Sequence, residues 1–442
     1  MTEKNKSSLL GRYLEQLDRS DTVRVRGRVQ EVTGLVVRAS VPRASVGELV
    51  EIRLKDGTTR PAEVVGFEGE AVVLMPLGEV DGIGPSAEVE STGKPLSIRC
   101  GPGLLGRVLD GVGDPIDGGP SLRGPGFQDW PLMRAAPDPF TRKRIEEPLS
   151  MGVRAIDGLL TVGRGQRVGL FAGSGVGKST LMGQIAKGSD AEIIVIALIG
   201  ERGREVRDFL EEVLGEEGMR RAVVVVATSD APSLVRLKSA FVATAIAEYF
   251  RETGQEVLLM MDSVTRFARA QREVGLAAGE PPARQGYPPS VFSMLPRLLE
   301  RTGNDAKGSI TALYTVLVAG GDMEEPIADE VRGILDGHIL LSRKLAKRNH
   351  WPAIDVLPSL SRVMNAVTDK EHLRAAGRFR EVLSTYESKR DLISLGAYEY
   401  GTDEEVDLAI DCIEEMNALL TQGLSEQTSL EETRDRLLDL FG

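Results

Sequence analysis

A glycine-rich stretch in the middle of the chain has the residue types that hold a phosphate. It reads AGSGVGKST from Ala172 to Thr180, and it follows the apolar run QRVGLF at residues 166–171. Glycines let backbone N–H groups point at phosphate oxygens, and the start of the next helix adds positive charge. Lys178 would reach the β- and γ-phosphates, and the Ser179 hydroxyl would bind Mg²⁺. The stretch predicts a nucleotide-binding loop made of Gly173, Ser174, Gly175, Val176, Gly177, Lys178, Ser179 and Thr180.

Two acidic residues come directly after apolar runs of the kind that form parallel strands. Asp262 follows EVLLMM (256–261), and Glu201 follows EIIVIALI (192–199). Ligands bind beyond the carboxyl ends of such strands, so both carboxylates are expected to face the phosphate loop. Asp262 would complete the Mg²⁺ shell with Ser179, although alone it could equally be a helix N-cap. Glu201 would polarise the water that attacks the γ-phosphate, although GERGRE alone is more typical of a solvated loop.

The elements that position these residues follow from the pattern around them. The apolar runs alternate with helical stretches such as 233–251, and continuous apolar character is typical of parallel strands buried on both faces. This alternation predicts a doubly wound α/β core. Its strands are expected at residues 166–171, 192–199, 221–228, 256–261 and 309–318.

The regions on either side of this core have different patterns. Short β segments from Thr22 to Val89, with a turn at Asp56-Gly57, predict a small antiparallel barrel. Residues 100–126 are rich in Gly and Pro and predict a linker of turns. The sequence therefore predicts an amphipathic helix at 1–21, a β-barrel domain at 22–95, a nucleotide-binding domain at 96–366 and a helical domain at 367–442.

Composition limits the function classes. The 442 residues contain 54 Lys and Arg against 66 Asp and Glu, a net charge of −12. The barrel region has Phe67 as its one aromatic, so stacking on single-stranded nucleic acid is not expected. No run reaches the roughly 20 apolar residues that span a bilayer. Cys100 and Cys412 form no metal or disulfide motif, so we expect a cytoplasmic protein with reduced thiols. Because the net charge is negative and the barrel has a single aromatic residue, we expect no nucleic-acid partner.

Longer stretches carry a family resemblance. They are GERGRE, MMDSVTRFARAQREVGLAAGEPPARQGYPPSVF, GSITALYTVLV, ADEVRGILDGHILLSRKLA and WPAIDVLPSLSRVM. Together they resemble the type III protein-secretion ATPases, which energise flagellar or injectisome export and are related to the catalytic β subunit of the rotary ATP synthase. The resemblance covers nearly all of residues 20–440. It implies an N-terminal β-barrel, a central RecA-like P-loop ATPase domain with a parallel sheet, and a C-terminal helical domain.

The resemblance also implies roles for further residues. Arg202 and Arg266 would position the catalytic carboxylate and the γ-phosphate. Arg362, in SLSRVM, matches the arginine finger that reaches a neighbouring subunit's nucleotide. Trp351 stands where relatives usually have Tyr against the adenine ring, and it keeps a stacking face. The predicted catalytic residues are thus Lys178, Glu201, Arg202, Arg266 and Arg362, with Mg²⁺ as the cofactor of ATP.

A finger that acts on a neighbour implies an assembly, because head-to-tail contacts between identical copies complete each site. The resemblance implies a homohexamer, a coiled-coil stalk protein as partner, and a dimeric stator-like regulator that docks on the N-terminal helix. It also implies export substrates with their chaperones, and an export gate at the inner membrane on whose cytoplasmic side the ring is peripheral. Hydrolysis would release chaperones and help to unfold the substrates.

Other functions remain open at this point. A rotary ATP synthase subunit would carry a DELSEED-like stretch, where this chain has DCIEEMNALLTQ. An RNA-translocating hexameric terminator has the same layout, but it would need aromatic residues in the barrel. A non-catalytic nucleotide-binding subunit would lack the glutamate that this chain has at Glu201. The sequence leaves flagellar and injectisome service undecided.

Overall fold

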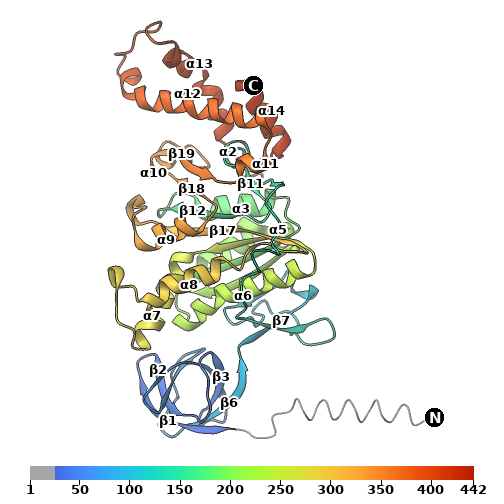
Figure 1. Cartoon of the computed structure of the whole chain (residues 1–442), viewed down its shortest axis with the longest axis vertical. Helices are drawn as coiled ribbons and strands as arrows, with labels where there is room; N and C mark the ends of the chain where they lie inside the picture. Colours follow the sequence, from blue (N-terminus) through green and yellow to red (C-terminus); the bar gives the residue numbers. More distant parts are fainter. Residues whose placement is uncertain (1–24) are drawn as a thin grey trace, which may run out of the picture. The chain divides into compact units, whose positions relative to one another are not determined.

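The computed structural model describes residues 25–442 and falls into two compact units, which divide between Leu96 and Ser97 (Figure 1). The amphipathic helix expected at 1–21, and the regulator expected to dock on it, lie outside the described residues. The domain boundaries predicted above stay a prediction.

The first unit contains a closed barrel of six antiparallel strands, as the sequence predicts (Figure 1). Alternate side chains such as Val50 and Ile52 fill its interior, and neighbouring residues face outward. The predicted turn at Asp56-Gly57 joins two strands, with Gly57 at φ +85°. The strands are paired in the order β1-β2-β5-β4-β3-β6. Their bounds are β1 Arg26–Thr33, β2 Val36–Ser40, β3 Glu48–Arg53, β4 Thr59–Glu68, β5 Ala71–Pro76 and β6 Glu88–Pro95.

The second unit is built on a nine-stranded sheet in the order β19-β18-β12-β17-β15-β13-β14-β8, with β16 paired to β17. All pairs are parallel except β18 with β19 and β16 with β17. The five strands predicted from apolar runs are confirmed as β12 Arg167–Ala172, β13 Ile193–Glu201, β14 Ala222–Thr228, β15 Glu256–Asp262 and β17 Ser309–Leu317.

The other four strands of this sheet were not predicted. They are β8 Val108–Asp110, β16 Gly303–Asn304, β18 Gly337–Leu341 and β19 Ile354–Ser361. The stretch expected to be a linker of turns therefore supplies the edge strand β8, which pairs with β14. Two small ladders, β7 Ser97–Cys100 with β9 Gln128–Pro131 and β10 Pro148–Leu149 with β11 Val162–Gly163, lie outside the sheet.

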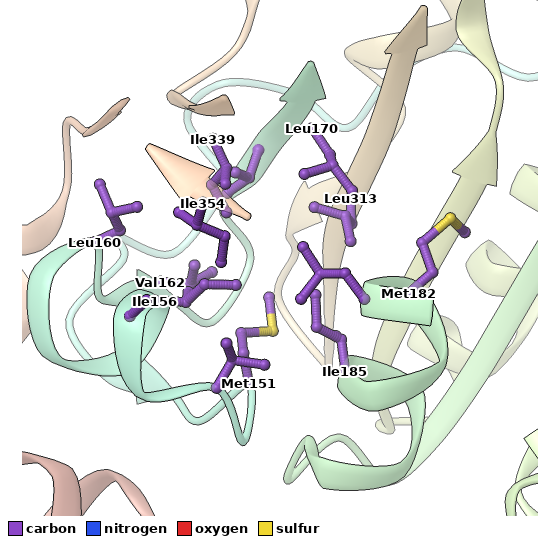
Figure 2. Close-up of a cluster of buried hydrophobic side chains, with 14 of the residues drawn as sticks. Met151, Ile156, Leu160, Val162, Leu170, Met182, Ile185, Leu313, Ile339 and Ile354 are labelled. Carbon is purple, nitrogen blue, oxygen red and sulfur yellow. The ribbon is translucent and has the colours of Figure 1, made fainter. Parts of the chain in front are cut away.

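Helices cover both faces of the sheet. On one face α6 (Ser233–Glu252) packs against the central strands, and on the other α3 (Lys178–Gly188) joins the main hydrophobic cluster. Figure 2 shows Met182 and Ile185 of α3 beside Leu170 and Leu313 of the strands. The remaining helices of this part are α2 Arg154–Leu159, α4 Gly203–Asp208, a π-helical turn Phe209–Leu214, α5 Gly215–Arg220, α7 Val264–Ala277, α8 Pro289–Leu299, α9 Pro326–Ile334, α10 Arg343–Lys347 and α11 Met364–Val367.

The chain ends in three helices, α12 Lys370–Ser394, α13 Glu404–Leu420 and α14 Leu430–Phe441, which confirms the helical region expected after the core. Asp369, Asp403 and Ser429 cap their first turns, as short polar side chains do. Arg154 of α2 is 3% exposed and ties this bundle to α2, since it donates to the carbonyl of Leu419 (3.1 Å). Between residues 25 and 442, no helix is both long enough and apolar enough to cross a membrane.

Candidate functional site

The phosphate loop lies at the carboxyl end of the central strand β12. The strand ends at Ala172, the loop follows, and α3 begins at Lys178. Gly175 (φ +74°) and Gly177 (φ +82°) have left-handed backbones that other residues adopt only with strain. Gly177 is also the N-cap of α3, so the unpaired N–H groups of the helix point into the loop. This part of the chain can hold an anion.

The predicted acids meet Lys178 beyond the strand ends. Lys178 forms an ion pair with Asp262 Oδ1, and its Nζ lies 3.7 Å from Glu201 Oε1. The Thr315 hydroxyl of β17 donates to the same Oδ1 at 2.8 Å. These residues meet because β12, β17, β15 and β13 are consecutive in the sheet and parallel, so that their carboxyl ends share one edge.

Glu201 is aimed by a local irregularity of β13. The pairing register shifts between Ile199 and Glu201, and Gly200 between them has φ +71°. Burial raises the pKa of Glu201 to about 7; the nearby charge of Asp262 adds to this, and Lys178 opposes it. A carboxylate with a pKa near neutrality can accept a proton and release it again.

The donor set fits a magnesium ion. Mg²⁺ prefers oxygen ligands, and the loop offers the exposed Ser179 hydroxyl while the sheet offers the buried Asp262 carboxylate. Both hydrogen-bonding contacts of Asp262 fall on Oδ1, which leaves Oδ2 for a cation.

The two arginines expected beside Glu201 are placed differently. The Arg266 side chain packs over Gly200, where a Cβ would lie 3.3 Å from Arg266 Cδ, and its charge lowers the pKa of Glu201. Arg266 Nε is buried without a hydrogen-bond partner within residues 25–442, as suits a donor that awaits a ligand. Arg202 is 81% exposed and pairs with Glu205 at 3.3 Å, so this chain alone does not bring it to the site.

Trp351 lies next to the phosphate loop. A Cβ on Gly177 would come within 2.8 Å of the Trp351 ring, so the glycine lets the ring approach. A cavity of about 400 Å³ opens here, lined by Trp351 and Pro352 on one side and by Thr180 and Gln184 of α3 on another. Its size and flat aromatic wall suit a nucleotide base.

Sequence reasoning missed the third wall of this cavity, which is formed by Gln422, Gly423 and Leu424 after α13. The backbone N–H of Gln422 donates to the carbonyl of Trp351 at 2.8 Å. Its side chain is buried, accepts from the N–H of Arg154 (2.9 Å) and donates to the carbonyl of Gly152 (2.9 Å). No motif marks this segment, because its place depends on the tertiary packing of the C-terminal helices.

Arg343 is a second residue that was missed. Its guanidinium lies 3.5 Å from the carbonyl oxygen of Ser174 in the phosphate loop, and it makes no ion pair with any residue from 25 to 442. A signal was present in the sequence, since Arg343 comes two residues after Leu341, the end of a strand that pairs in parallel with β12.

Arg362, the expected finger, lies far from the phosphate loop of its own chain. Ser361 is paired with Gly337, and His338 with Gly169, so Arg362 is level with the start of β12. From Arg167 to Gly173 is six residues, about 20 Å of strand at about 3.3 Å each. The Arg362 side chain is exposed and has no ion pair or hydrogen bond with the described residues. It is therefore free to meet another molecule.

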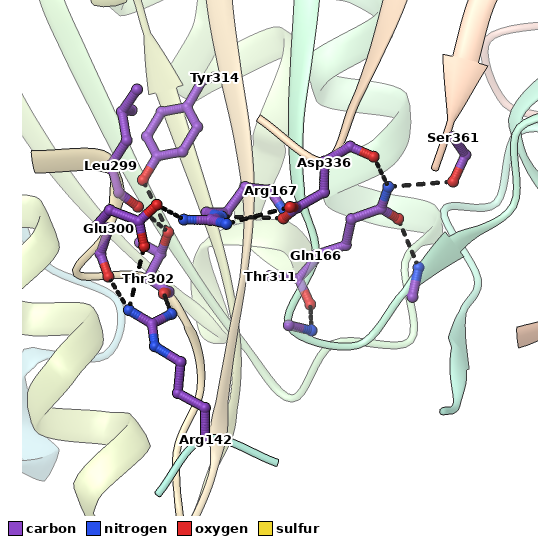
Figure 3. A network of polar contacts seen from close by, with 12 residues as sticks. Arg142, Gln166, Arg167, Leu299, Glu300, Thr302, Thr311, Tyr314, Asp336 and Ser361 are labelled. Carbon is purple, nitrogen blue, oxygen red and sulfur yellow. Dashed lines mark hydrogen bonds and ion pairs between the residues drawn. The ribbon is translucent and has the colours of Figure 1, made fainter. Parts of the chain in front are cut away.

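A polar network joins Gln166, Arg167, Asp336 and Ser361, the residue before Arg362 (Figure 3). The carbonyl of Asp336 accepts from the N–H of Arg362 (3.0 Å) and from Gln166 Nε2 (3.0 Å). Gln166 is fully buried and also donates to the Ser361 hydroxyl at 3.1 Å. Arg167 contacts the Asp336 carboxylate at 3.0 Å and Glu300 at 2.6 Å. The Arg362 side chain thus projects from a fixed strand end.

Comparisons with known proteins match three parts of the chain. Residues 152–361 match the "ATP synthase alpha/beta family, nucleotide-binding domain", and residues 29–93 match the beta-barrel domain of that family. Residues 368–439 match the "T3SS EscN ATPase C-terminal domain".

Individual relatives are similar over almost the whole chain. A "Flagellum-specific ATP synthase" of Bacillus subtilis is 53% identical over 97% of this chain and 98% of its own length. A "Type 3 secretion system ATPase" of Xanthomonas euvesicatoria is 52% identical over 93% of each. The assembled ATPase EscN of the enteropathogenic E. coli type III secretion system superposes with a TM-score of 0.89, at 48% identity over 94% of this chain and 100% of EscN. EscN in complex with its central stalk EscO gives 0.87, with the same identity and coverage.

Proposed function

This chain belongs to the ATP synthase alpha/beta family, in its flagellar and type III secretion branch, and we propose that it hydrolyses ATP between neighbouring copies to drive protein export. One observation carries the proposal. The phosphate loop, Glu201 and Asp262 meet at one edge of the sheet, while Arg362 lies about 20 Å away along the strand direction.

Each part of the site has a defined task in this proposal. The loop from Gly173 to Thr180 binds the phosphates, and Lys178 moves from Asp262 to the β- and γ-phosphates. Ser179 and Asp262 hold Mg²⁺, which neutralises charge on the phosphate oxygens. Glu201 accepts a proton from the attacking water and orients it, and Trp351 holds the base.

Three arginines act around the phosphates in this proposal. Arg266 contacts the γ-phosphate from the side of Glu201, and Arg202 steadies the loop after Glu201. Arg362 of a neighbouring copy meets the negative charge that spreads over the phosphate oxygens in the transition state. Because the contact is head-to-tail, repeated copies close a ring, which we propose to be a homohexamer. The EscN structures, one assembled and one with a central stalk, support self-association and a stalk partner.

The ring would act at the inner membrane export gate, peripheral on its cytoplasmic side, where it releases chaperones from export substrates and helps to unfold them. A dimeric stator-like regulator would dock at residues 1–21. The match of residues 368–439 to the EscN C-terminal domain favours this role over a subunit of a rotary ATP synthase. The relatives include both flagellar and secretion proteins, so either service fits.

Mixing two inactive variants tests whether the site is shared. Glu201→Gln keeps its finger but cannot activate water, and Arg362→Ala keeps its glutamate but has no finger. Each alone is expected to lose at least about 100-fold in turnover. Assembled together in equal amounts, they restore about a quarter of the sites, because one quarter of random neighbours combine an intact glutamate with an intact finger.

The matched control mixes Glu201→Gln with Lys178→Ala. Both defects lie in the same half of the site, so no pair of neighbours is complete and no activity returns. A Glu201→Gln and Arg362→Ala mixture that stays as inactive as this control contradicts the shared site.

A further inference from the structure

A second cavity lies on the other side of the base pocket wall. It measures about 510 Å³ and opens between α10, β19 and the C-terminal helices α12 and α13, all within the second unit. It contains no residue of the phosphate loop and none of the predicted catalytic residues. Its volume is in the range of small-molecule sites in proteins.

Positive charge gathers at one side of this cavity. Lys344, Arg348 and Arg390 all contact a single carboxylate, that of Glu387, at 3.3 Å, 3.6 Å and 2.6 Å. The other acid of the lining is Asp355, whose pKa is raised by burial and by the charge of Glu387. Three basic side chains stand against two acidic ones in the lining, so the basic charges are in excess.

The rest of the lining is largely apolar, with side chains such as Leu345, Ile354, Leu383 and Ile413. His350 also lines the cavity, and its Nε2 is buried with no hydrogen-bond partner in the described part of the chain. The lining therefore suits a molecule with an apolar body and an anionic head.

The second cavity and the base pocket share their walls. Residues 349–352 and 417–424 supply both, since His350 and Thr421 face the second cavity while Trp351 and Gln422 face the base pocket. The hydrogen bond from the N–H of Gln422 to the carbonyl of Trp351 ties the two segments together (2.8 Å). A ligand that fixes one side of this wall restricts the other.

We propose that the cavity between α10, β19, α12 and α13 is a regulatory site for a small organic anion with an apolar body, such as an aryl carboxylate or sulfonate. The ligand places its anionic group among Lys344, Arg348 and Arg390 and its body against the apolar lining. Occupancy tightens the binding of nucleotide, because it holds Trp351 and Gln422 in place. The coupling rests on the proposed nucleotide site, whereas binding of the anion does not.

Fluorescence titration of the full-length protein with anilinonaphthalene sulfonate tests the site. The double variant Lys344→Gln with Arg390→Gln is expected to bind the probe at least about tenfold more weakly, since two charged contacts are lost. Lys347→Gln is the matched control, because Lys347 lies on the same helix, is exposed and does not line the cavity. It should bind like the unchanged protein. Equal binding by both variants, or no binding at all, overturns the site.

Two further measurements separate this inference from the proposed function. The Lys178→Ala variant, which would not turn over ATP, should bind the probe normally, and displacement of the probe by a non-hydrolysable ATP analogue overturns a separate site. In the unchanged protein the probe should tighten binding of the analogue several-fold, and this effect should vanish in the Lys344→Gln, Arg390→Gln variant. Probe binding with no effect on the analogue overturns the coupling.

Discussion

The charge of one side chain, Glu201, sets an expected pH dependence. Its pKa is raised to about 7, first by burial and then by the charge of Asp262. A raised pKa means that the carboxyl is protonated as pH falls below about 7, and a protonated carboxyl cannot accept a proton from water. We expect kcat/KM for ATP to be full above this value and to fall as pH decreases through it.

The profile is measured from initial rates at saturating Mg²⁺ over about pH 5.5 to 9. Glu201→Gln supplies the control, because the residual rate of this variant should no longer fall as pH decreases through about 7. A profile of the unchanged protein that is flat through pH 7 would count against Glu201 as the proton acceptor.

Substitutions of a second single residue, Trp351, test the base pocket. Trp351→Ala removes the aromatic wall over Gly177 and should raise KM for ATP about fivefold with little change in kcat, since stacking is worth about 1 kcal/mol. Trp351→Tyr retains a stacking face and should stay within about threefold of the unchanged protein. Steady-state kinetics of the two variants measure these changes. An unchanged KM in Trp351→Ala would show that the Trp351 ring does not contact the base.

At the scale of elements, a buried ion pair fixes α6 to the segment after α8. Arg301 and Glu248 are each 1% exposed, and two hydrogen bonds join them at 2.8 Å and 2.7 Å. Arg301 also donates to the carbonyl of Leu132 at 2.9 Å. Removing one charge leaves the other buried without its partner, so Glu248→Gln should lower the free energy of unfolding by about 3–5 kcal/mol.

Urea unfolding measures this loss. The control is Glu211→Gln, which breaks the exposed pair with Arg207 and should cost no more than about 0.5 kcal/mol. Equal stabilities of the two variants would show that the buried pair does not support the fold.

The strands show which parts of the fold the sequence could predict. The predicted strands are buried on both faces, so their continuous apolar runs made them predictable; they are β12, β13, β14, β15 and β17. β19 was missed because it alternates between buried and exposed residues and contains Pro358, which is typical of an edge. β8 has three residues, too few for a pattern.

The site, like the strands, contains residues that a local sequence pattern predicts and residues that it does not. The phosphate loop, Glu201 and Asp262 follow local rules, namely a motif and the ends of apolar strands, and the structure brings them together. Gln422 to Leu424 and the 510 Å³ cavity depend on how the C-terminal helices pack against β19, which no local pattern encodes. The roles proposed for these residues, and for Arg202, Arg266, Trp351 and Arg362, stay predictions, and that of Arg362 needs a neighbouring copy.

At the scale of the whole molecule, the proposed role of Arg362 in a neighbour's site makes ATP turnover depend on protein concentration. We expect turnover per chain to rise steeply with protein concentration and to level off once assembly is complete. Arg362→Ala should assemble in parallel, as followed by light scattering, without the rise in turnover. Turnover that is constant at concentrations where light scattering finds single chains would contradict this dependence.

The strand β19 lies between two residues that are proposed to act in two different nucleotide sites of the ring. Trp351, proposed to contact the base of the chain's own nucleotide, stands three residues before this strand, and Arg362, proposed to act in the neighbour's site, stands one residue after it. Eight residues of hydrogen-bonded backbone act as a lever between them. In the proposed ring, a tilt of β19 on loading or emptying one pocket would also move Arg362, and so the state of one site would reach the site of the next copy.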